Sequence, residues 1–276
     1  MNAKSMRHGL RLLAILALLG AAVFPIYWMF VTSLTSSKDL FAARPNLLPS
    51  FSELHVYWDV FSIKPVAKWL LNSAIVAVGT TVASIALSVL PAYALSRFRF
   101  RGKGAVGFGL FTTQMLPEAM LVVPLYAIFA KLSLLNSLGG LILANTAFTV
   151  PVVVWILKGA IDGVPLEIEE AARVDGCSRL GIVMSVVVPL IAPTLAAASV
   201  IAFFHGWNEY VFAQTFITED RLHTASVGLA GFVGELSTPI HSVMAVGFIY
   251  TLPAVAFYLM VQKHVVAGMT AGSVKG

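Results

Sequence analysis

Residues Glu167 to Gly176 read Glu-Ile-Glu-Glu-Ala-Ala-Arg-Val-Asp-Gly and form a charged segment between two long apolar runs. A carboxylate such as that of Glu170 can make a charge-assisted hydrogen bond to a basic group of another molecule. Helical spacing places Ala171 and Ala172 on a face whose small side chains permit close approach. Gly176 is expected to end this helix in the left-handed conformation. The segment therefore predicts a short helix that binds a partner, although a solvated helix would have the same residues.

Polar side chains inside the apolar runs form a second set of candidates. Burying such a group in lipid costs about 2–4 kcal/mol unless it is paired or faces water. The residues are Gln114, Glu118, Asn145 and Asn208. Hydrogen bonds between helices, worth about 1 kcal/mol each, are an equally good explanation for the three amides. Glu118 follows Pro117, which is expected to interrupt the helix, and this acid is predicted to face a water-lined pathway.

The sequence gives no support for catalysis, metal binding or nucleotide binding by this chain. Gly102 to Gly107 matches the dinucleotide motif Gly-x-Gly-x-x-Gly by letter, but it joins two apolar runs in a basic turn and lacks the strand and helix that this motif needs, so it is interpreted as a chance match. One cysteine and six histidines occur without metal-ligand spacing, so no metal site is predicted. No Gly-x4-Gly-Lys-Ser/Thr loop is found, so another subunit must bind any ATP. The chain is not expected to be an enzyme, because His205 and Glu118 are expected at different depths in the membrane and would form no catalytic cluster.

Composition places the chain among membrane proteins. Of its 276 residues, 58% are hydrophobic and 11% are charged, and the mean hydropathy is +0.87. Soluble domains carry about 25% charged residues. An all-α, polytopic membrane protein is therefore predicted.

Six apolar runs are long enough to cross a bilayer as helices. They cover residues of about 12–34, 69–95, 105–130, 138–157, 190–213 and 240–261. The first run exceeds the apolar core of a removable signal peptide and is interpreted as an uncleaved helix. One transmembrane domain spanning residues 1–276 is expected.

The basic residues predict the orientation. Twelve of the 18 Lys and Arg residues lie in the termini, the connection after the second run, and the loop 158–189. Cytoplasmic segments carry such an excess. Both termini, the loop 158–189 and the tail 262–276 are therefore expected in the cytoplasm, and the net charge of +5 requires no nucleic-acid partner.

A spaced pattern extends the charged segment and resembles a known loop. It consists of Glu170-Ala171-Ala172, Gly176 and, further on, Val186-Val187-Val188-Pro189. In a polytopic chain this pattern resembles the cytoplasmic loop of permease subunits of binding-protein-dependent ABC importers. The carbohydrate branch, typified by the smaller maltose permease, is favoured by three further features. These are Pro124-Leu125-Tyr126, the Trp-Asn-Glu element within Phe204–Tyr210, and the tail Val266–Gly276.

The resemblance covers essentially the whole chain and implies a type I ABC importer permease fold. In that family the loop helix docks as a coupling helix in a cleft of the ATPase subunit. It implies ATPase coupling by Glu170, Ala171, Ala172, Asp175, Gly176 and Pro189. It also implies a second homologous permease, two ATP-binding subunits that use ATP and Mg, and an extracytoplasmic solute-binding protein. The chain itself would bind no cofactor and would lie in a bacterial inner membrane.

Two further segments are assigned to partners through the same resemblance. The outer connection 214–239 is predicted to contact the binding protein through Gly228, Gly231 and Gly234. The tail is predicted to enter the ATPase interface through Thr270, Gly272 and Lys275. After Val266 the tail is too rich in glycine and small polar residues to be expected to form a helix alone.

The solute implied by the resemblance is a sugar or sugar-like compound: a saccharide, a glycoside or a polyol derivative. The alternative function is an ion-coupled secondary transporter or channel that uses Glu118. Such transporters carry discontinuous helices in two repeated halves, and the sequence has no such repeat.

Overall fold

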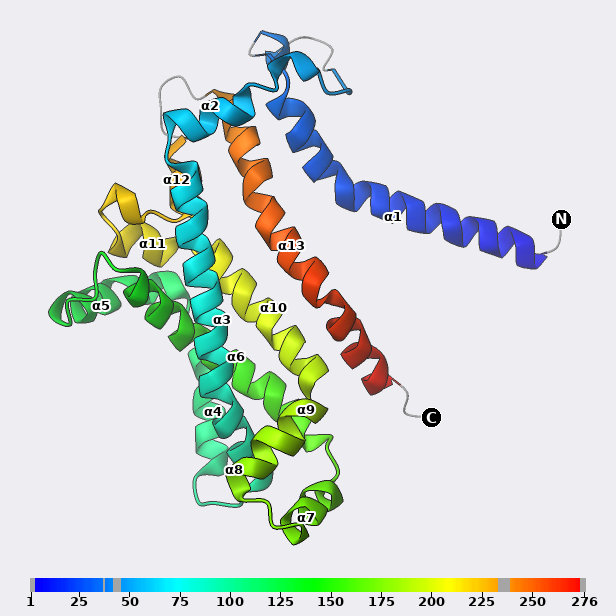
Figure 1. The fold of residues 1–276 in the computed structure, drawn as a ribbon, viewed down its shortest axis with the longest axis vertical. Helices are drawn as coiled ribbons and strands as arrows, with labels where there is room; N and C mark the ends of the chain where they lie inside the picture. The colour runs from blue at the N-terminus through cyan, green and yellow to red at the C-terminus, as the bar shows by residue number, and fades with distance from the viewer. Residues whose placement is uncertain (1–2, 37, 42–45, 233–238, 274–276) are drawn as a thin grey trace. The chain divides into compact units, whose positions relative to one another are not determined.

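The computed structural model describes residues 3–36, 38–41, 46–232 and 239–273 (Figure 1). Every regular element within these ranges is a helix, so the all-α prediction is confirmed. The chain divides into two compact units, Met1–Val66 with Leu229–Leu252, and Ala67–Gly228 with Pro253–Gly276.

The first unit contains the long helix α1 (Ala3–Ser33), the short helices η1 (Asp39–Phe41) and η2 (Phe51–Glu53), and α2 (Val56–Ile63). The first part of α13 (Ile240–Ser273) completes it. An aromatic cluster holds these helices together, since the ring of Phe30 lies 5.1 Å from Phe248 and 6.4 Å from Tyr57. The Tyr57 hydroxyl also hydrogen-bonds the Ser33 hydroxyl at 2.7 Å.

The second unit contains most of the remaining helices. In chain order they are α3 (Val66–Arg97), α4 (Lys103–Thr113), α5 (Glu118–Lys131), α6 (Leu138–Asp162), α7 (Leu166–Val174), α8 (Arg179–Ile182), the π-helical η3 (Val183–Val187), α9 (Val188–Leu190), α10 (Ala192–Asn208), α11 (Val211–Phe216), η4 (Asp220–Leu222) and α12 (Ala225–Phe232). One buried cluster joins α3, α6, η3 and α10, and a second joins α3, α5, α6 and α11. Residues of both α3 and α6 thus occur in both clusters.

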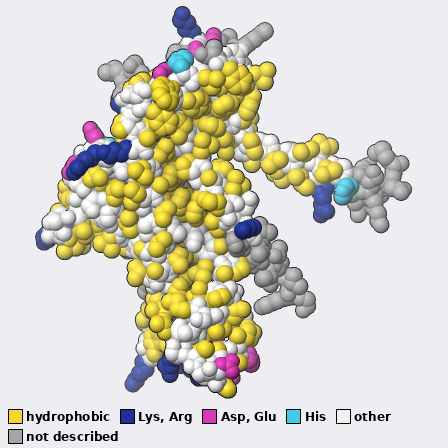
Figure 2. Space-filling model, in the orientation of Figure 1, with side chains coloured by type: hydrophobic (Ala, Val, Ile, Leu, Met, Phe, Trp, Pro, Cys, Tyr) yellow, Lys and Arg dark blue, Asp and Glu magenta, His cyan; other side chains and the backbone are white. Residues whose placement is uncertain are grey.

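Six candidate membrane spans are present, but two of them are bent. Four helices are long and apolar enough to cross a bilayer: His8–Ser33, Val66–Arg97, Leu138–Asp162 and Ile240–Lys263. The pair α4 and α5 is bent by 100°, and the pair Arg179–Leu190 and Ala192–Phe216 by 82°. Six spans result if each bent pair is one span. Hydrophobic side chains cover most of the face of the second unit in Figure 2, and charged side chains gather near α7 and α8.

The interruption at Pro117 was expected within the run 105–130, whereas the size of that bend and the bend between Leu190 and Ala192 were not. Pro117 has an extended backbone, with φ −61° and ψ 129°, directly before α5. Proline lacks the N–H that would continue α4, so the helix ends and the chain changes direction. A further difference concerns the tail, because the backbone of α13 stays helical to Ser273, beyond the expected boundary at residue 261.

Candidate functional site

Helix α7 is the predicted partner-binding helix, and its ends follow from its own residues. Pro165 precedes it in an extended conformation, and Glu167 and Glu169 lie in its first turn. Acidic groups at a helix N-terminus interact favourably with the helix dipole. Arg173 in the last turn does the same at the opposite end.

Gly176 ends α7 as predicted. Its φ is +86°, in the left-handed region. Its N–H donates to the Arg173 carbonyl at 3.1 Å, and the N–H of Cys177 donates to the Ala172 carbonyl at 3.0 Å. These two bonds define a Schellman motif. A Cβ at Gly176 would meet nothing within 4 Å, so the glycine is required by its backbone conformation and not by a contact within this chain.

Most of α7 is exposed. Glu170, Ala171 and Asp175 are exposed, and Ala172 is half-buried. Val174 has an exposed fraction of 88% despite being apolar. Pro189, the last residue of the spaced pattern, is also exposed and lies in α9. The helix thus presents an acidic group beside small and apolar side chains.

Glu169 is the exception, and sequence reasoning missed it. It is 2% exposed and is the buried residue of α7. Its carboxylate accepts hydrogen bonds from Arg97 Nε at 2.6 Å and from the Tyr93 hydroxyl at 2.7 Å. Arg97 Nη2 also donates to the Val164 carbonyl at 2.7 Å. Glu169 lies three residues before Ala172 on one helix face, which was a signal that this face packs against the chain itself.

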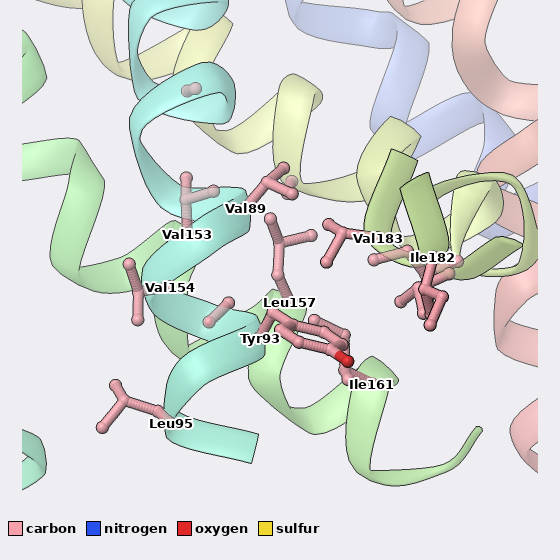
Figure 3. Close-up of a cluster of buried hydrophobic side chains, with 14 residues drawn as sticks. Val89, Tyr93, Leu95, Val153, Val154, Leu157, Ile161, Ile182 and Val183 are labelled. Carbon is pink, nitrogen blue, oxygen red and sulfur yellow. The ribbon is translucent and has the colours of Figure 1, made fainter. Parts of the chain in front are cut away.

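Other contacts fix the rest of the loop 158–189. The Asp162 carboxylate accepts bonds from Ser96 and Lys158, each at 2.6 Å. Within the loop, Ile182 and Val183 are buried in the cluster that includes Tyr93, Leu157 and Ile161 (Figure 3). The loop is therefore held on the end of α3 by both polar and apolar contacts.

The start of α5 and the junction between α10 and α11 meet at a small cavity of about 240 Å³. Its lining residues are Glu118, Phe204, His205, Asn208, Glu209, Tyr210 and Val211. Glu118 and Asn208, two predicted pathway residues, are thus brought together. His205 Nε2 lies 3.7 Å from Glu118 Oε1. The expectation that His205 and Glu118 lie at different depths was wrong, because the interruption at Pro117 was expected but its 100° bend was not.

Glu209 shapes the junction between α10 and α11, which is separate from the 82° bend between Leu190 and Ala192. Its carboxylate accepts bonds from the backbone N–H groups of Phe212 at 2.5 Å and Ala213 at 2.9 Å. These groups lack partners within α11 because they belong to its first turn. The Ser226 hydroxyl donates to the Glu209 carbonyl at 2.6 Å. Glu209 is 7% exposed and caps α11.

Gln114 and Asn145, the other predicted pathway residues, lie outside this cavity. Gln114 Nε2 donates to the Phe148 carbonyl of α6 at 3.1 Å, which is a hydrogen bond between helices. Gln114 also borders a separate, mainly apolar cavity of about 420 Å³. Asn145 is fully buried, and its Nδ2 donates to the Leu141 carbonyl at 2.8 Å. Gln114 thus makes the interhelical bond that the alternative explanation anticipates, whereas the Asn145 bond lies within α6.

The sequence matches a family of known transport proteins. The family model described as "Binding-protein-dependent transport system inner membrane component" matches residues 84–271. This chain belongs to that family. The permease is therefore a multi-pass inner-membrane transport protein.

Two relatives and one solved structure illustrate the match. The permease is 34% identical over 267 residues to the sulfoquinovosyl glycerol transport system permease protein SmoH of Agrobacterium fabrum, covering 97% of this chain and 94% of that protein. It is 36% identical over 270 residues to the trehalose/maltose transport system permease protein MalG of Thermococcus litoralis, covering 96% of each. A bacterial ABC transporter involved in alginate import has the same fold, with a TM-score of 0.81 and 24% identity over 96% of this chain and 99% of that chain.

The outer segment of the permease is only partly as expected. Gly228 is buried within α12, and a Cβ there would lie 2.3 Å from two ring carbons of Trp69. This packing accounts for the glycine without a partner. Gly231 is exposed, with nothing within 4 Å of its Cβ position. Gly234 lies outside the described residues.

The tail 262–276 is the last segment that was assigned to a partner. Thr270 and Gly272 lie in the helical backbone of α13, and Lys275 lies outside the described residues.

Among the residues that the structure describes, no three His, Cys, Asp or Glu side chains are grouped so that they could hold a metal ion.

Proposed function

We propose that the permease is one membrane subunit of an ATP-driven importer. It would receive a sugar or sugar-like solute from an extracytoplasmic binding protein and release it into the cytoplasm. The partners would be a second permease and two ATP-binding subunits that use ATP and Mg. The observation that carries this proposal is the exposed helix α7, which the Schellman motif ends and the buried Glu169 holds in place.

Helix α7 would be the coupling helix. Glu170 is exposed and available for a basic residue of the ATPase subunit, and Ala171 leaves room for close approach. Gly176 would act by setting the end of the helix, since its conformation requires a glycine. Asp175 and Pro189 are exposed at the same loop. With α7 facing the ATPase subunit in the cytoplasm, both chain termini would also lie in the cytoplasm.

The solute class is inferred from the relatives. SmoH is named for sulfoquinovosyl glycerol and MalG for trehalose and maltose. The cavity at the helix breaks offers acceptors and donors that suit hydroxyl groups, from Glu118, His205 and Asn208. We assign Glu118 and Asn208 to the translocation pathway, while Gln114 and Asn145 would support it through their hydrogen bonds.

Two regions would contact other partners. Gly231 and Gly234, near the end of the outer segment, would contact the binding protein. Gly228 is left out of this surface because it packs against Trp69. Thr270 and Gly272, in the helical backbone of α13, would reach the ATPase interface together with Lys275.

The test is solute uptake by the complete transporter in proteoliposomes. A calorimetric screen of the binding protein against sugars, glycosides and polyols first identifies the solute. Glu170→Lys is then expected to reduce ATP-dependent uptake at least tenfold, because it places a cation where a carboxylate is needed. Cys177→Ser, which changes an exposed neighbour of Gly176, is the control and should keep wild-type uptake. Wild-type uptake by Glu170→Lys would contradict the assignment of α7.

A further inference from the structure

Helix α3 is the element that the structure connects to both proposed partner surfaces. It is one uninterrupted helix of 32 residues, from Val66 to Arg97. At 1.5 Å per residue this is about 48 Å, enough to cross a bilayer and reach beyond it. In contrast, the α4–α5 pair is bent by 100°, and the pair containing α10 by 82°.

The outer end of α3 holds the segment that leads to the proposed binding-protein surface. Asn72 Nδ2 donates to the carbonyls of Arg221 at 3.1 Å and His223 at 2.9 Å. The Ser73 hydroxyl accepts the N–H of Ala225 at 2.8 Å, at the start of α12. Asn72 and Ser73 are 5% and 1% exposed. The Ser73 bond is buried and the two Asn72 bonds are part-buried, and all three join residues about 150 positions apart in the sequence.

The inner end of α3 holds α7. Arg97 and Tyr93 both donate to the Glu169 carboxylate, and Arg97 also binds the carbonyl of Val164 just before α7. The side chains of Arg97 and Glu169 are 10% and 3% exposed. Asp162 at the end of α6 also bonds α3, through Ser96. Polar contacts of the loop 158–189 therefore converge on the last turns of α3.

The middle of α3 is embedded in both buried clusters of the second unit. Val76 and Ala92 belong to different clusters, and Val89 lies in the cluster of Ala92, where Figure 3 labels it. A packed helix of this kind cannot shift at one end without moving its neighbours, because protein interiors are close-packed.

We propose that α3 is the strut that transmits binding-protein docking at the outer segment to α7, with Asn72, Arg97 and Glu169 as positioning residues. This inference rests on the proposed function, because it needs both partners. Glu169 touches no solute or nucleotide in this account. It sets the position of α7, on which Glu170 engages the ATPase subunit.

The experiment measures the fold stimulation of ATP hydrolysis by solute-loaded binding protein, with the complete transporter in lipid nanodiscs. Glu169→Ala removes the acceptor for Arg97 and is expected to reduce the stimulation at least tenfold. Glu169→Gln keeps the shape and one acceptor, so its loss should be smaller. Asn72→Ala at the outer end removes both hydrogen bonds of Asn72 and should reduce the stimulation by about fivefold, which at RT of about 0.59 kcal/mol corresponds to a loss of roughly 1 kcal/mol.

Matched controls separate transmission from general damage. Lys158→Gln breaks an ion pair of the same 2.6 Å length, but one that lies within α6. Arg221→Gln breaks an exposed ion pair of the outer segment without removing the carbonyl that Asn72 binds. Both controls should keep wild-type stimulation.

The double variant Asn72→Ala with Glu169→Ala distinguishes a strut from two separate structural defects. Independent sites have effects that multiply, whereas coupled sites do not. If a substitution at one end of α3 already abolishes transmission, a second substitution at the other end cannot reduce it further. The double variant should therefore be no worse than Glu169→Ala alone, and multiplied losses would overturn the proposal.

Wild-type stimulation in an assembled Glu169→Ala transporter would also overturn it. If Glu169→Ala does not assemble, Glu169→Gln decides by the same criterion. Glu170→Lys is measured in parallel. When it abolishes stimulation while both Glu169 variants retain it, the strut fails but the coupling role of α7 stands. Retained stimulation in Glu170→Lys contradicts the proposed function itself.

Discussion

Two buried glutamates, Glu169 in α7 and Glu209 at the α10–α11 break, are satisfied in opposite ways. Glu169 binds Arg97 and Tyr93, which are more than 70 residues earlier in the chain. Glu209 binds backbone N–H groups three and four residues later. A buried carboxylate can thus join two distant elements or shape one local turn. Only the first arrangement transmits a displacement between elements, so substitutions in the two regions should have different consequences.

Arg97→Met is expected to have the largest effect. It leaves the Glu169 carboxylate buried without its cation, and breaking a buried pair in this way costs about 3–5 kcal/mol. Amide hydrogen exchange over residues 166–174 should accelerate strongly, while exchange over 211–216 stays at the wild-type rate. Equal acceleration in both segments would show that Arg97 supports the whole unit and not α7 in particular.

Gly228→Ala is expected to be next in size. The new Cβ would collide with the Trp69 ring at 2.3 Å, and such overpacking costs about 1–3 kcal/mol. The midpoint of thermal unfolding in detergent should fall. Gly231→Ala, in the same helix but with open space around it, is the matched control. If the midpoint falls in the control, or does not fall in Gly228→Ala, the packing of Gly228 against Trp69 is contradicted.

Glu209→Ala should have a smaller and local effect. It removes the acceptor for two N–H groups of α11, and loss of such a cap costs about 0.5–2 kcal/mol. Hydrogen exchange should accelerate over 211–216 and remain unchanged over 166–174, the reverse of the Arg97→Met pattern. This pair of variants tests the contrast between the two glutamates. Faster hydrogen exchange in α7 after Glu209→Ala would contradict this contrast.

Gly176→Ala is expected to have the most local effect, confined to one turn. A left-handed alanine costs about 1–2 kcal/mol, and no atom of this chain blocks its Cβ. Exchange should accelerate only in the last turn of α7. Gly163→Ala, at an ordinary φ of −80°, should leave exchange unchanged. A similar response in both variants would contradict the role assigned to the left-handed conformation.

The sequence predicted features that depend on neighbouring residues. The end of α7 at Gly176 and the interruption at Pro117 follow from local backbone chemistry, and both occur. Four of the six apolar runs correspond to helices long and apolar enough to span a membrane, and the other two correspond to bent helix pairs, because length and hydropathy are local as well. The carbohydrate-branch resemblance rested on short motifs and agrees with the relatives.

Features that depend on distant residues were not predicted. The Arg97–Glu169 pair joins positions 72 residues apart, and nothing in either segment indicates the other. The bend angles of 100° and 82° depend on what each half-helix packs against. That uncertainty also led to the wrong placement of His205 relative to Glu118. Gly228 was assigned to a partner because its packing on Trp69 has no local signal.

The most direct test of the central claim, that α7 docks on an ATPase subunit, is disulfide cross-linking. Ala171→Cys in a Cys177→Ser background places one thiol on the exposed face of α7. In the assembled transporter, with single cysteines placed along the cleft of the ATPase subunit, we predict a cross-link between the permease and that subunit. Cross-linking to the second permease alone, or none at any cleft position in an active complex, would contradict the account.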